Sequence, residues 1–314
     1  MNDTDRKIIA ICGPTAVGKT RFAIEAALAL GGEIISCDSM QLYQYMDIGS
    51  AKPTAEEQSK VRHYLVDQID PRESFSVARY QKLAKTAIEE VFVHGKIPII
   101  AGGTGLYLNS LLYDMDFSAP PENNGFRDAM YALAEEQGPA AVYDRLRAAD
   151  SAAADRIHPN NLKKVIRALE AAEAGNRVKD FASDPVPTKD YSPVLVGLNR
   201  DRQELYDRIN RRVDMLMEQG LEQEVRKLLS MGLTGTDISM KGIGYKELIG
   251  YIQGEYDREE AVRLIKRNTR HLAKRQLTWF RRYRDMKWFS ISEYESEERC
   301  ICAMNEWLRE QIKS

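Results

Sequence analysis

KIIAICGPTAVGKTRFAIEAALAL, residues 7–30, is the stretch that decides the fold. It begins with a short run of mainly β-branched apolar residues, passes through a glycine-rich turn, and continues with residues that favour a helix. Gly31 and Gly32 follow as a plausible end of that helix. We therefore expect a buried strand over 7–12, joined by a tight turn to a helix over 19–30.

The turn, GPTAVGKT, matches the phosphate-binding pattern G-x-x-x-x-G-K-[ST] at every fixed position. Its two glycines allow the backbone to curl, so that successive N–H groups converge on an anion at the start of the helix. Lys19 is expected to pair with a phosphate, and the Thr20 hydroxyl to coordinate Mg²⁺. The predicted phosphate-binding residues are Gly13, Pro14, Thr15, Ala16, Val17, Gly18, Lys19 and Thr20.

Further apolar strands are predicted at 33–39, 96–103 and 194–198, with helical stretches between them. Near-continuous apolar strands that alternate with helices indicate a parallel sheet covered by helices on both faces. The sequence thus predicts an α/β fold of the P-loop NTPase kind, similar to nucleoside kinases.

The composition changes after residue 117, where a loop rich in Pro and Asn leads into an Ala-rich helical stretch without strand signals. Because a strand pattern resumes near residue 194, we interpret 119–190 as an all-α insertion domain. The catalytic core is then predicted to comprise 1–118 and 191–314, and its last part, 201–310, to be mainly helical.

The overall composition excludes several classes of protein. The 314 residues carry a formal net charge of −2, and 43% apolar with 29% charged residues is typical of a globular chain. No apolar run approaches a membrane span, the N-terminus is unlike a signal peptide, and the four cysteines contain no C-x-x-C pair. We therefore expect a cytoplasmic protein in which any nucleic acid is bound by a local basic patch.

Asp38 is the acid that stands at the end of a predicted strand, the one that follows the phosphate-loop helix. A guanine-reading N-K-x-D motif is missing, and the strand at 97–101 runs into Gly102 and Gly103 where an ATPase would have a metal-binding acid. In P-loop kinases of small substrates this position faces the acceptor, so we expect Asp38 to act as a base. The structural alternative is an Asp that caps the next loop or helix.

The segment GGTGLY (102–107) follows the third predicted strand. Its glycines would let the backbone approach a ligand and would hold the Thr104 hydroxyl at the carboxyl edge of the sheet, where α/β proteins bind ligands. Gly-Gly turns after strands are common, so this signal is weak when it stands alone.

A basic segment lies near the C-terminus. The stretch 266–288 contains nine Lys and Arg residues and one acid. On a helix over 262–284, at about 100° per residue, the basic side chains gather on one face and apolar ones on the opposite face. Such a helix suits phosphodiester contacts, although a charge run can also be a solvated surface. The basic face comprises Arg263, Arg267, Arg270, Lys274 and Arg281, and the apolar face Ile265, Leu272, Trp279 and Tyr283.

The helix predicted over 203–219 is rich in arginine in its first half. Four arginines stand there, any of which could close on a leaving phosphate as a lid: Arg202, Arg208, Arg211 and Arg212. They could equally be surface residues.

Six motifs occur in the order found in the tRNA dimethylallyltransferase family, and the second is far more specific than the phosphate loop. They are GPTAVGKT (13–20), DSMQLYQYMDIGSAKP (38–53), GGTGLYL (102–108), HPNNLKKVIRALE (158–170), MKGIGYKEL (240–248) and RHLAKRQLTWFRR (270–282). The chain resembles this family over nearly its whole length. It is similar to the bacterial members, because the C-terminal zinc finger of the eukaryotic members is missing.

The resemblance implies an activity. A dimethylallyl group would pass from dimethylallyl diphosphate to the exocyclic N6 amine of the adenosine directly 3′ of the anticodon, in tRNAs that read codons beginning with U. The products would be N6-isopentenyladenosine and pyrophosphate. The phosphate loop would then hold the pyrophosphate leaving group, with Mg²⁺ as cofactor, which explains a complete loop without a metal-binding acid. A monomer would suffice to clasp one anticodon stem-loop.

The resemblance also implies residue roles. Asp38 would be the general base, Thr104 would contact the acceptor, and Lys19 and Arg208 would stabilise the departing pyrophosphate, which Arg212 would also bind. The target adenine is expected to flip into a channel, because a stacked base cannot react. The predicted tRNA-binding residues are Asp38, Ser39, Met40, Gln41, Thr104, Arg127, Lys163, Lys164, Arg167, Arg270, Lys274 and Arg281.

Three other functions stay open on the sequence. An ATP-dependent kinase of a small acceptor explains residues 1–110 equally well, but it leaves the insertion and the basic segment unexplained. A prenyltransferase of free adenine nucleotides would need no basic segment, because its substrate is small. A non-catalytic tRNA-binding protein with a vestigial phosphate loop is disfavoured by the intact Lys19, Thr20 and Asp38.

Overall fold

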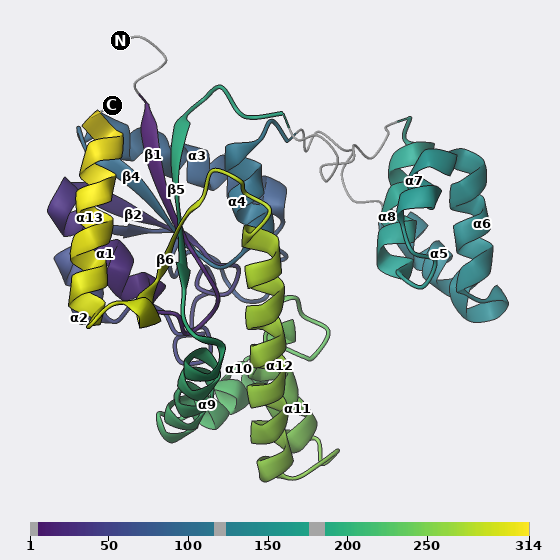
Figure 1. Ribbon diagram of the computed structural model, residues 1–314. Coiled ribbons are helices and arrows are strands. Elements are labelled where there is room, and N and C mark those ends of the chain that lie inside the picture. The colour runs from purple at the N-terminus through teal and green to yellow at the C-terminus, as the bar shows by residue number, and fades with distance from the viewer. Residues whose placement is uncertain (1–5, 116–123, 176–185, 314) are drawn as a thin grey trace. The chain divides into compact units, whose positions relative to one another are not determined.

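The computed structural model describes residues 6–115, 124–175 and 186–313 (Figure 1). The chain forms two compact units, one made of Met1–Tyr113 with Thr188–Ser314 and the other of Asp114–Pro187. Among the described residues, no helix combines the length and the apolar composition needed to cross a membrane.

The first unit is built on a six-stranded sheet with the order β3-β2-β4-β1-β5-β6, in which every neighbouring pair is parallel. This confirms the predicted α/β fold. The short strands β3 and β6 were not predicted, because runs of two and four residues carry too little alternation to be recognised. The strands are β1 (Lys7–Cys12), β2 (Gly32–Cys37), β3 (His63–Tyr64), β4 (Ile97–Gly102), β5 (Ser192–Asn199) and β6 (Lys287–Ser290).

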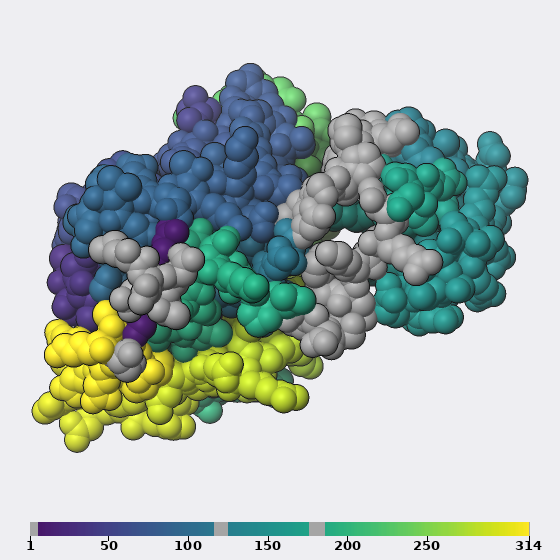
Figure 2. Space-filling view, turned by 90° about the horizontal axis from the view of Figure 1, so that it is seen from above, coloured from purple at the N-terminus to yellow at the C-terminus, as the bar shows by residue number. Residues whose placement is uncertain are grey.

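Helices cover both faces of the sheet (Figure 1). On one face α1 (Lys19–Leu30) and α13 (Glu297–Lys313) share a core with alternate strand residues such as Ile9 and Ile11. The space-filling view shows the yellow C-terminal part of the chain beside the purple N-terminal part (Figure 2). On the other face lie α3 (Val77–Val93) and α4 (Gly105–Leu112). Because both faces are covered, successive strand residues are buried, as the sequence predicts.

Further helices follow the strands at the carboxyl end of the sheet (Figure 1). They are α2 (Ala55–Lys60), α9 (Arg202–Glu218), α10 (Leu221–Ser230), α11 (Tyr245–Ile252) and α12 (Arg258–Phe280). The basic helix predicted over 262–284 is α12, but it ends at Phe280 and Arg281 is its C-cap. Arg281 and Tyr283 therefore lie beyond the helix, and their predicted places on its two faces are wrong.

The second unit is helical in its described part. Its helices are α5 (Asn124–Gln137), α6 (Pro139–Ala149), α7 (Ser151–Arg156) and α8 (Leu162–Glu173). They enclose a small core that includes Val142, Leu146, Val165 and Leu169. The Asn161 side chain accepts a hydrogen bond from the Lys164 backbone and so caps α8.

A buried carboxylate fixes the loop that follows β2. Glu224 of α10 accepts hydrogen bonds from the backbone N–H groups of Asp47, Ile48 and Gly49, at 2.7–3.0 Å, and from the Tyr245 hydroxyl at 2.8 Å. Gly49 leaves room for the Tyr245 ring, since a Cβ there would lie 2.5 Å from it. One buried carboxylate therefore accepts the hydrogen bonds of three successive backbone N–H groups in this loop, which would otherwise need partners in a helix or a strand.

We expect Glu224→Ala to lower the free energy of unfolding by about 2–4 kcal/mol, because it leaves several backbone donors without a partner. Urea denaturation followed by circular dichroism measures this value. Glu218→Ala, on the exposed side of α9, is the matched control and should change stability by less than about 0.5 kcal/mol. Equal stabilities of the two variants would contradict the role assigned to Glu224.

Candidate active site

The carboxyl ends of β1, β2 and β4 meet at one edge of the sheet. Cys12 and Cys37 are both paired with Gly102, which lies between them. A Cβ at Gly102 would lie 2.0 Å from the carbonyl oxygen of Cys37, so only glycine fits at this close approach. Beyond this edge the chain continues as the phosphate loop after β1, as Asp38 after β2, and as the segment that carries Thr104 after β4.

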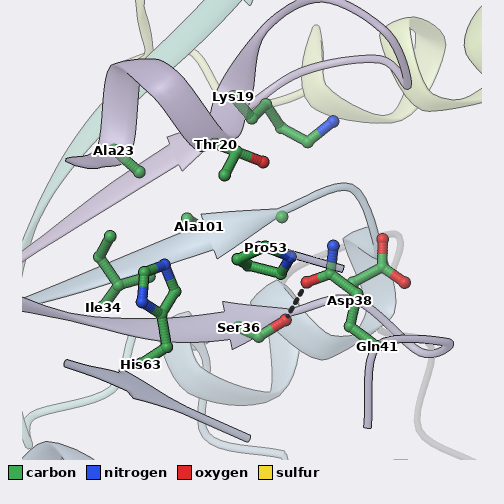
Figure 3. A pocket seen from close by; sticks show the side chains of 11 residues that line it. Lys19, Thr20, Ala23, Ile34, Ser36, Asp38, Gln41, Pro53, His63 and Ala101 are labelled. Carbon is green, nitrogen blue, oxygen red and sulfur yellow. Dashed lines mark hydrogen bonds between the residues drawn. The ribbon is translucent and has the colours of Figure 1, made fainter. Parts of the chain in front are cut away.

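These three segments line a cavity of about 1370 Å³, whose other walls come from the loop after β2 and from α9 and α12. A smaller pocket at its base is shown in Figure 3. There Lys19 and Thr20 lie on one side, and Asp38 with Gln41 on the other. An ammonium group and a hydroxyl suited to a phosphorylated ligand thus lie across the cavity from a carboxylate.

The phosphate loop has the backbone that its sequence predicts. Gly18, the N-cap of α1, has a φ of 114°, and Ala16 has a φ of 63°, so the chain turns sharply before the helix. Gly13 lies against β5, where a Cβ at Gly13 would be 2.6 Å from the carbonyl oxygen of Leu198. In the described part of the chain no side chain caps α1, so its first N–H groups are available to an anion.

Lys19 projects from the start of α1 into the cavity, and its ammonium group donates to the carbonyl oxygen of Pro14 at 2.8 Å. Burial lowers the pKa of Lys19 to about 8, with a smaller contribution from the nearby Arg212 in the same direction, while the charge of Asp38 opposes this shift. Burial likewise lowers the pKa of Arg212, and Asp38 opposes that shift too. An anionic ligand would therefore stabilise the charged forms of both Lys19 and Arg212.

Two arginines hold the carbonyl groups of the phosphate loop. Arg208 donates through Nε to the carbonyl oxygen of Ala16 at 3.1 Å, and Arg200 donates to that of Val17 at 3.0 Å. Glu297, at the start of α13, forms ion pairs with both guanidinium groups. Arg208 thus contacts a backbone carbonyl group of the phosphate loop, and its role at a leaving phosphate stays a prediction. Of the two lid candidates Arg208 and Arg212, Arg212 is the one that interacts electrostatically with Lys19 and Asp38.

Asp38 and Thr104 are brought together across β2 and β4. The Asp38 carboxylate accepts a hydrogen bond from the Met40 backbone at 2.9 Å through one oxygen. Thr104 Oγ1 accepts one from the Ser39 backbone at 3.1 Å, which leaves the hydroxyl proton free to donate. Both side chains line the cavity. The hydrogen bond to Met40 confirms that Asp38 caps the loop after β2, and its place in the cavity leaves the second carboxylate oxygen open to a ligand, so the role of base stays a prediction.

The next predicted residues, Ser39, Met40 and Gln41, also line the cavity. The Gln41 amide accepts from the Ser36 hydroxyl at 2.8 Å (Figure 3) and donates to the carbonyl oxygen of Ala51 at 3.3 Å. Gln41 therefore joins β2 to the loop held by Glu224.

The fit of Mg²⁺ can be judged from the residues around Thr20. Its hydroxyl lines the pocket that also contains Asp38. The described residues contain no group of three or more His, Cys, Asp or Glu side chains that could hold a metal. A hydroxyl without a protein cage fits the way in which Mg²⁺ is bound chiefly through phosphate oxygens and water.

The predicted tRNA-binding residues outside the cavity fall into two groups. In the second unit Lys163, Lys164 and Arg167 are exposed on α8, whereas Arg127 forms an ion pair with Glu170 at 2.7 Å. In the first unit Lys274 and Arg281 are exposed, and Arg270 donates to Asn210 of α9 at 2.6 Å.

Sequence reasoning missed the side of α12 that faces the cavity. Leu272 and Trp279, predicted to pack against the core, line the cavity instead, together with Arg275 and Gln276. The helical period placed them on one face correctly. Nothing in that period distinguishes a face that lines a cavity from one that is buried against the core.

A phosphate loop opposite a carboxylate, at the carboxyl edge of a parallel sheet, defines an α/β P-loop enzyme that transfers a group from a phosphorylated donor to an acceptor. The particular family follows from comparison with known proteins. The family model "IPP transferase" matches residues 41–283. The chain therefore belongs to the IPP transferase family.

The relatives agree with this assignment. The tRNA dimethylallyltransferase of Alkaliphilus oremlandii is 54% identical over 93% of this chain and 94% of its own, and that of Clostridioides difficile is 47% identical over 98% of each. A full-length tRNA isopentenylpyrophosphate transferase from Bacillus halodurans is similar in structure with a TM-score of 0.74, at 42% identity over 98% and 97% of the two chains. A eukaryotic dimethylallyltransferase acting on tRNA has a TM-score of 0.82, at 26% identity over 97% and 80%. They confirm the resemblance found in the sequence.

The lowered pKa of Lys19 predicts a pH dependence of anion binding. We expect the protonated ammonium group to pair with pyrophosphate, so the affinity for pyrophosphate should fall as the pH rises through about 8, by up to about tenfold per pH unit. Isothermal titration calorimetry with pyrophosphate between pH 7 and 9.5 measures it. Lys19→Ala should bind weakly throughout and follow only the ionisation of pyrophosphate, so parallel pH profiles would contradict the prediction.

Proposed function

We propose that this protein transfers the dimethylallyl group of dimethylallyl diphosphate to the exocyclic N6 amine of the adenosine directly 3′ of the anticodon, in tRNAs that read codons beginning with U. The products are N6-isopentenyladenosine and pyrophosphate. The observation that carries the proposal is that Lys19, Thr20, Asp38 and Thr104 line one and the same cavity. Lys19 and Thr20 lie across from Asp38 there (Figure 3). The names of the relatives favour tRNA over a free nucleotide as the acceptor, and prenyl transfer over phosphorylation.

The phosphate loop acts on the leaving group. Departure of pyrophosphate gives the dimethylallyl fragment cationic character, so stabilising the departing negative charge is the main task. The N–H groups at the start of α1, with Lys19 and Arg212, serve this purpose, and Arg208 holds the loop through Ala16 and lies within reach of the cavity. Mg²⁺, held by Thr20 and by oxygens of the diphosphate, would neutralise part of that charge.

Asp38 and Thr104 act on the acceptor. The exocyclic amine becomes acidic as it bonds to carbon, so the Asp38 carboxylate can take its proton. The Thr104 hydroxyl, whose oxygen already accepts from Ser39, donates to the adenine. Ser39, Met40 and Gln41 line the space that a flipped base would occupy.

The rest of the tRNA is held by basic side chains. We assign phosphodiester contacts to Lys163, Lys164 and Arg167 on the exposed face of α8, and to Arg270, Lys274 and Arg281 in the first unit. Arg127, also predicted there, joins α5 to α8 through Glu170. A monomer would suffice to clasp one anticodon stem-loop, and a tRNA substrate fits a cytoplasmic location.

The transfer itself is tested with radiolabelled dimethylallyl diphosphate and Mg²⁺. We expect label on an anticodon stem-loop that carries three consecutive adenosines at the target position, and none on AMP or on a stem-loop without the target adenosine. Label on AMP would support a nucleotide prenyltransferase instead. Consumption of ATP without any label would show that the donor is wrong.

Asp38→Asn should reduce kcat by about 10²–10⁴-fold, because it removes the base. The amide oxygen can still accept from Met40, so the loop should keep its shape, and pyrophosphate affinity at pH 7 should change only a few-fold. Single-turnover transfer and calorimetry measure the two quantities. The control is Asp207→Asn on the exposed side of α9; an Asp38→Asn variant as active as this control would exclude Asp38 as the base.

A further inference from the structure

Gln276 connects the two loops that bind the two substrates. Gln276 lies four residues before the end of α12 at Phe280, and its side chain lines the cavity. Gln276 Oε1 accepts a hydrogen bond from the Thr15 backbone of the phosphate loop at 2.8 Å. Its Nε2 donates to the carbonyl oxygen of Gly103, which precedes Thr104, at 2.9 Å.

The two bonds fix the orientation of the amide. A backbone N–H can only donate and a carbonyl oxygen can only accept, so the oxygen of Gln276 must face Thr15 and its nitrogen must face Gly103. A primary amide at this distance from the helix satisfies both partners at once. Asn would be too short, and Glu would place a carboxylate oxygen against the carbonyl oxygen of Gly103.

Helix α12 packs so closely against the GGTG segment that two of its glycines leave no room for a Cβ. A Cβ at Gly103 would lie 2.4 Å from Gln276 Nε2, and a Cβ at Gly105 would lie 2.3 Å from the Trp279 ring. Helix α12 therefore contacts this segment on both sides of Thr104, one turn apart. The close approach explains two glycines that the sequence alone assigns only to ligand binding.

We propose that Gln276 is a positioning residue, which sets the separation between the leaving group on the phosphate loop and the acceptor beside Thr104 and Asp38. The proposal rests on the proposed transfer reaction. It makes no use of a contact between Gln276 and either substrate. It also assigns the Thr15 N–H to Gln276, and so removes this group from those that bind pyrophosphate.

Such a role has a kinetic consequence. Each substrate keeps its own binding groups when the bridge is lost, because Lys19 and α1 hold the diphosphate and Asp38 with Thr104 contacts the acceptor. What changes is the placement of the reacting atoms, and a misplacement of about 1 Å can cost about 10²-fold in rate. Loss of the bridge is therefore expected in kcat more than in KM.

The test is Gln276→Met, which keeps the length of the side chain and removes both hydrogen bonds. We expect kcat to fall about 10–100-fold, with the KM values for dimethylallyl diphosphate and for the stem-loop, and the Kd for pyrophosphate, each within about threefold of the unaltered protein. Gln253→Met, at an exposed position after α11, is the matched control and should leave all four values unchanged. Gln276→Glu keeps an acceptor for Thr15 but repels Gly103, and it should lose kcat as well; it is the variant to measure if Gln276→Met does not fold.

The outcomes separate this proposal from the reaction on which it rests. No label transfer by the unaltered protein would refute the reaction. An active protein together with unchanged kcat in Gln276→Met would refute the bridge. A loss of kcat matched by an equal loss of pyrophosphate affinity would also refute it, because it would mean that the phosphate loop has simply collapsed.

Discussion

The parallel register of β1, β4 and β2 is the constraint on which the active site depends. Gly102 is paired with Cys12 on one side and Cys37 on the other, and beyond it the Thr104 N–H donates to the Cys37 carbonyl at 3.1 Å. A shift of β4 by one residue would turn its side chains to the opposite faces and remove Thr104 from the cavity. Backbone hydrogen bonds thus set how far the phosphate loop lies from Asp38 and Thr104.

The phosphate loop then needs support for its carbonyl oxygens. A loop that offers its N–H groups to an anion must point several carbonyl groups elsewhere, and these need donors of their own. Lys19, Arg208 and Arg200 supply them. Glu297 offsets the charge of the two arginines, so the loop is held without adding two uncompensated cations beneath it.

Local sequence signals predicted the parts of the site that depend on local structure. The strand, turn and helix of the phosphate loop and the position of Asp38 at a strand end follow from short patterns. Glu224 and Gln276 could not be found in this way, because the loops that they hold are bound through backbone groups more than 170 residues away in the chain. Backbone groups carry no residue type for a pattern to match. The pairing of Arg127 with Glu170 was missed for a related reason, since charge alone does not show which cations already have a partner.

Electrostatics link the two halves of the proposed reaction. In the absence of substrate, the negative charge of Asp38 favours the charged forms of both Lys19 and Arg212, against burial and their mutual repulsion. When Asp38 takes the proton of the amine, this compensating charge disappears while pyrophosphate is being released. Once protonated, Asp38 would no longer repel the departing pyrophosphate, although it would also cease to favour the charged form of Lys19. In the proposed reaction, proton transfer to Asp38 would thus remove a negative charge that lies across the cavity from the leaving group, which a base outside the cavity could not do.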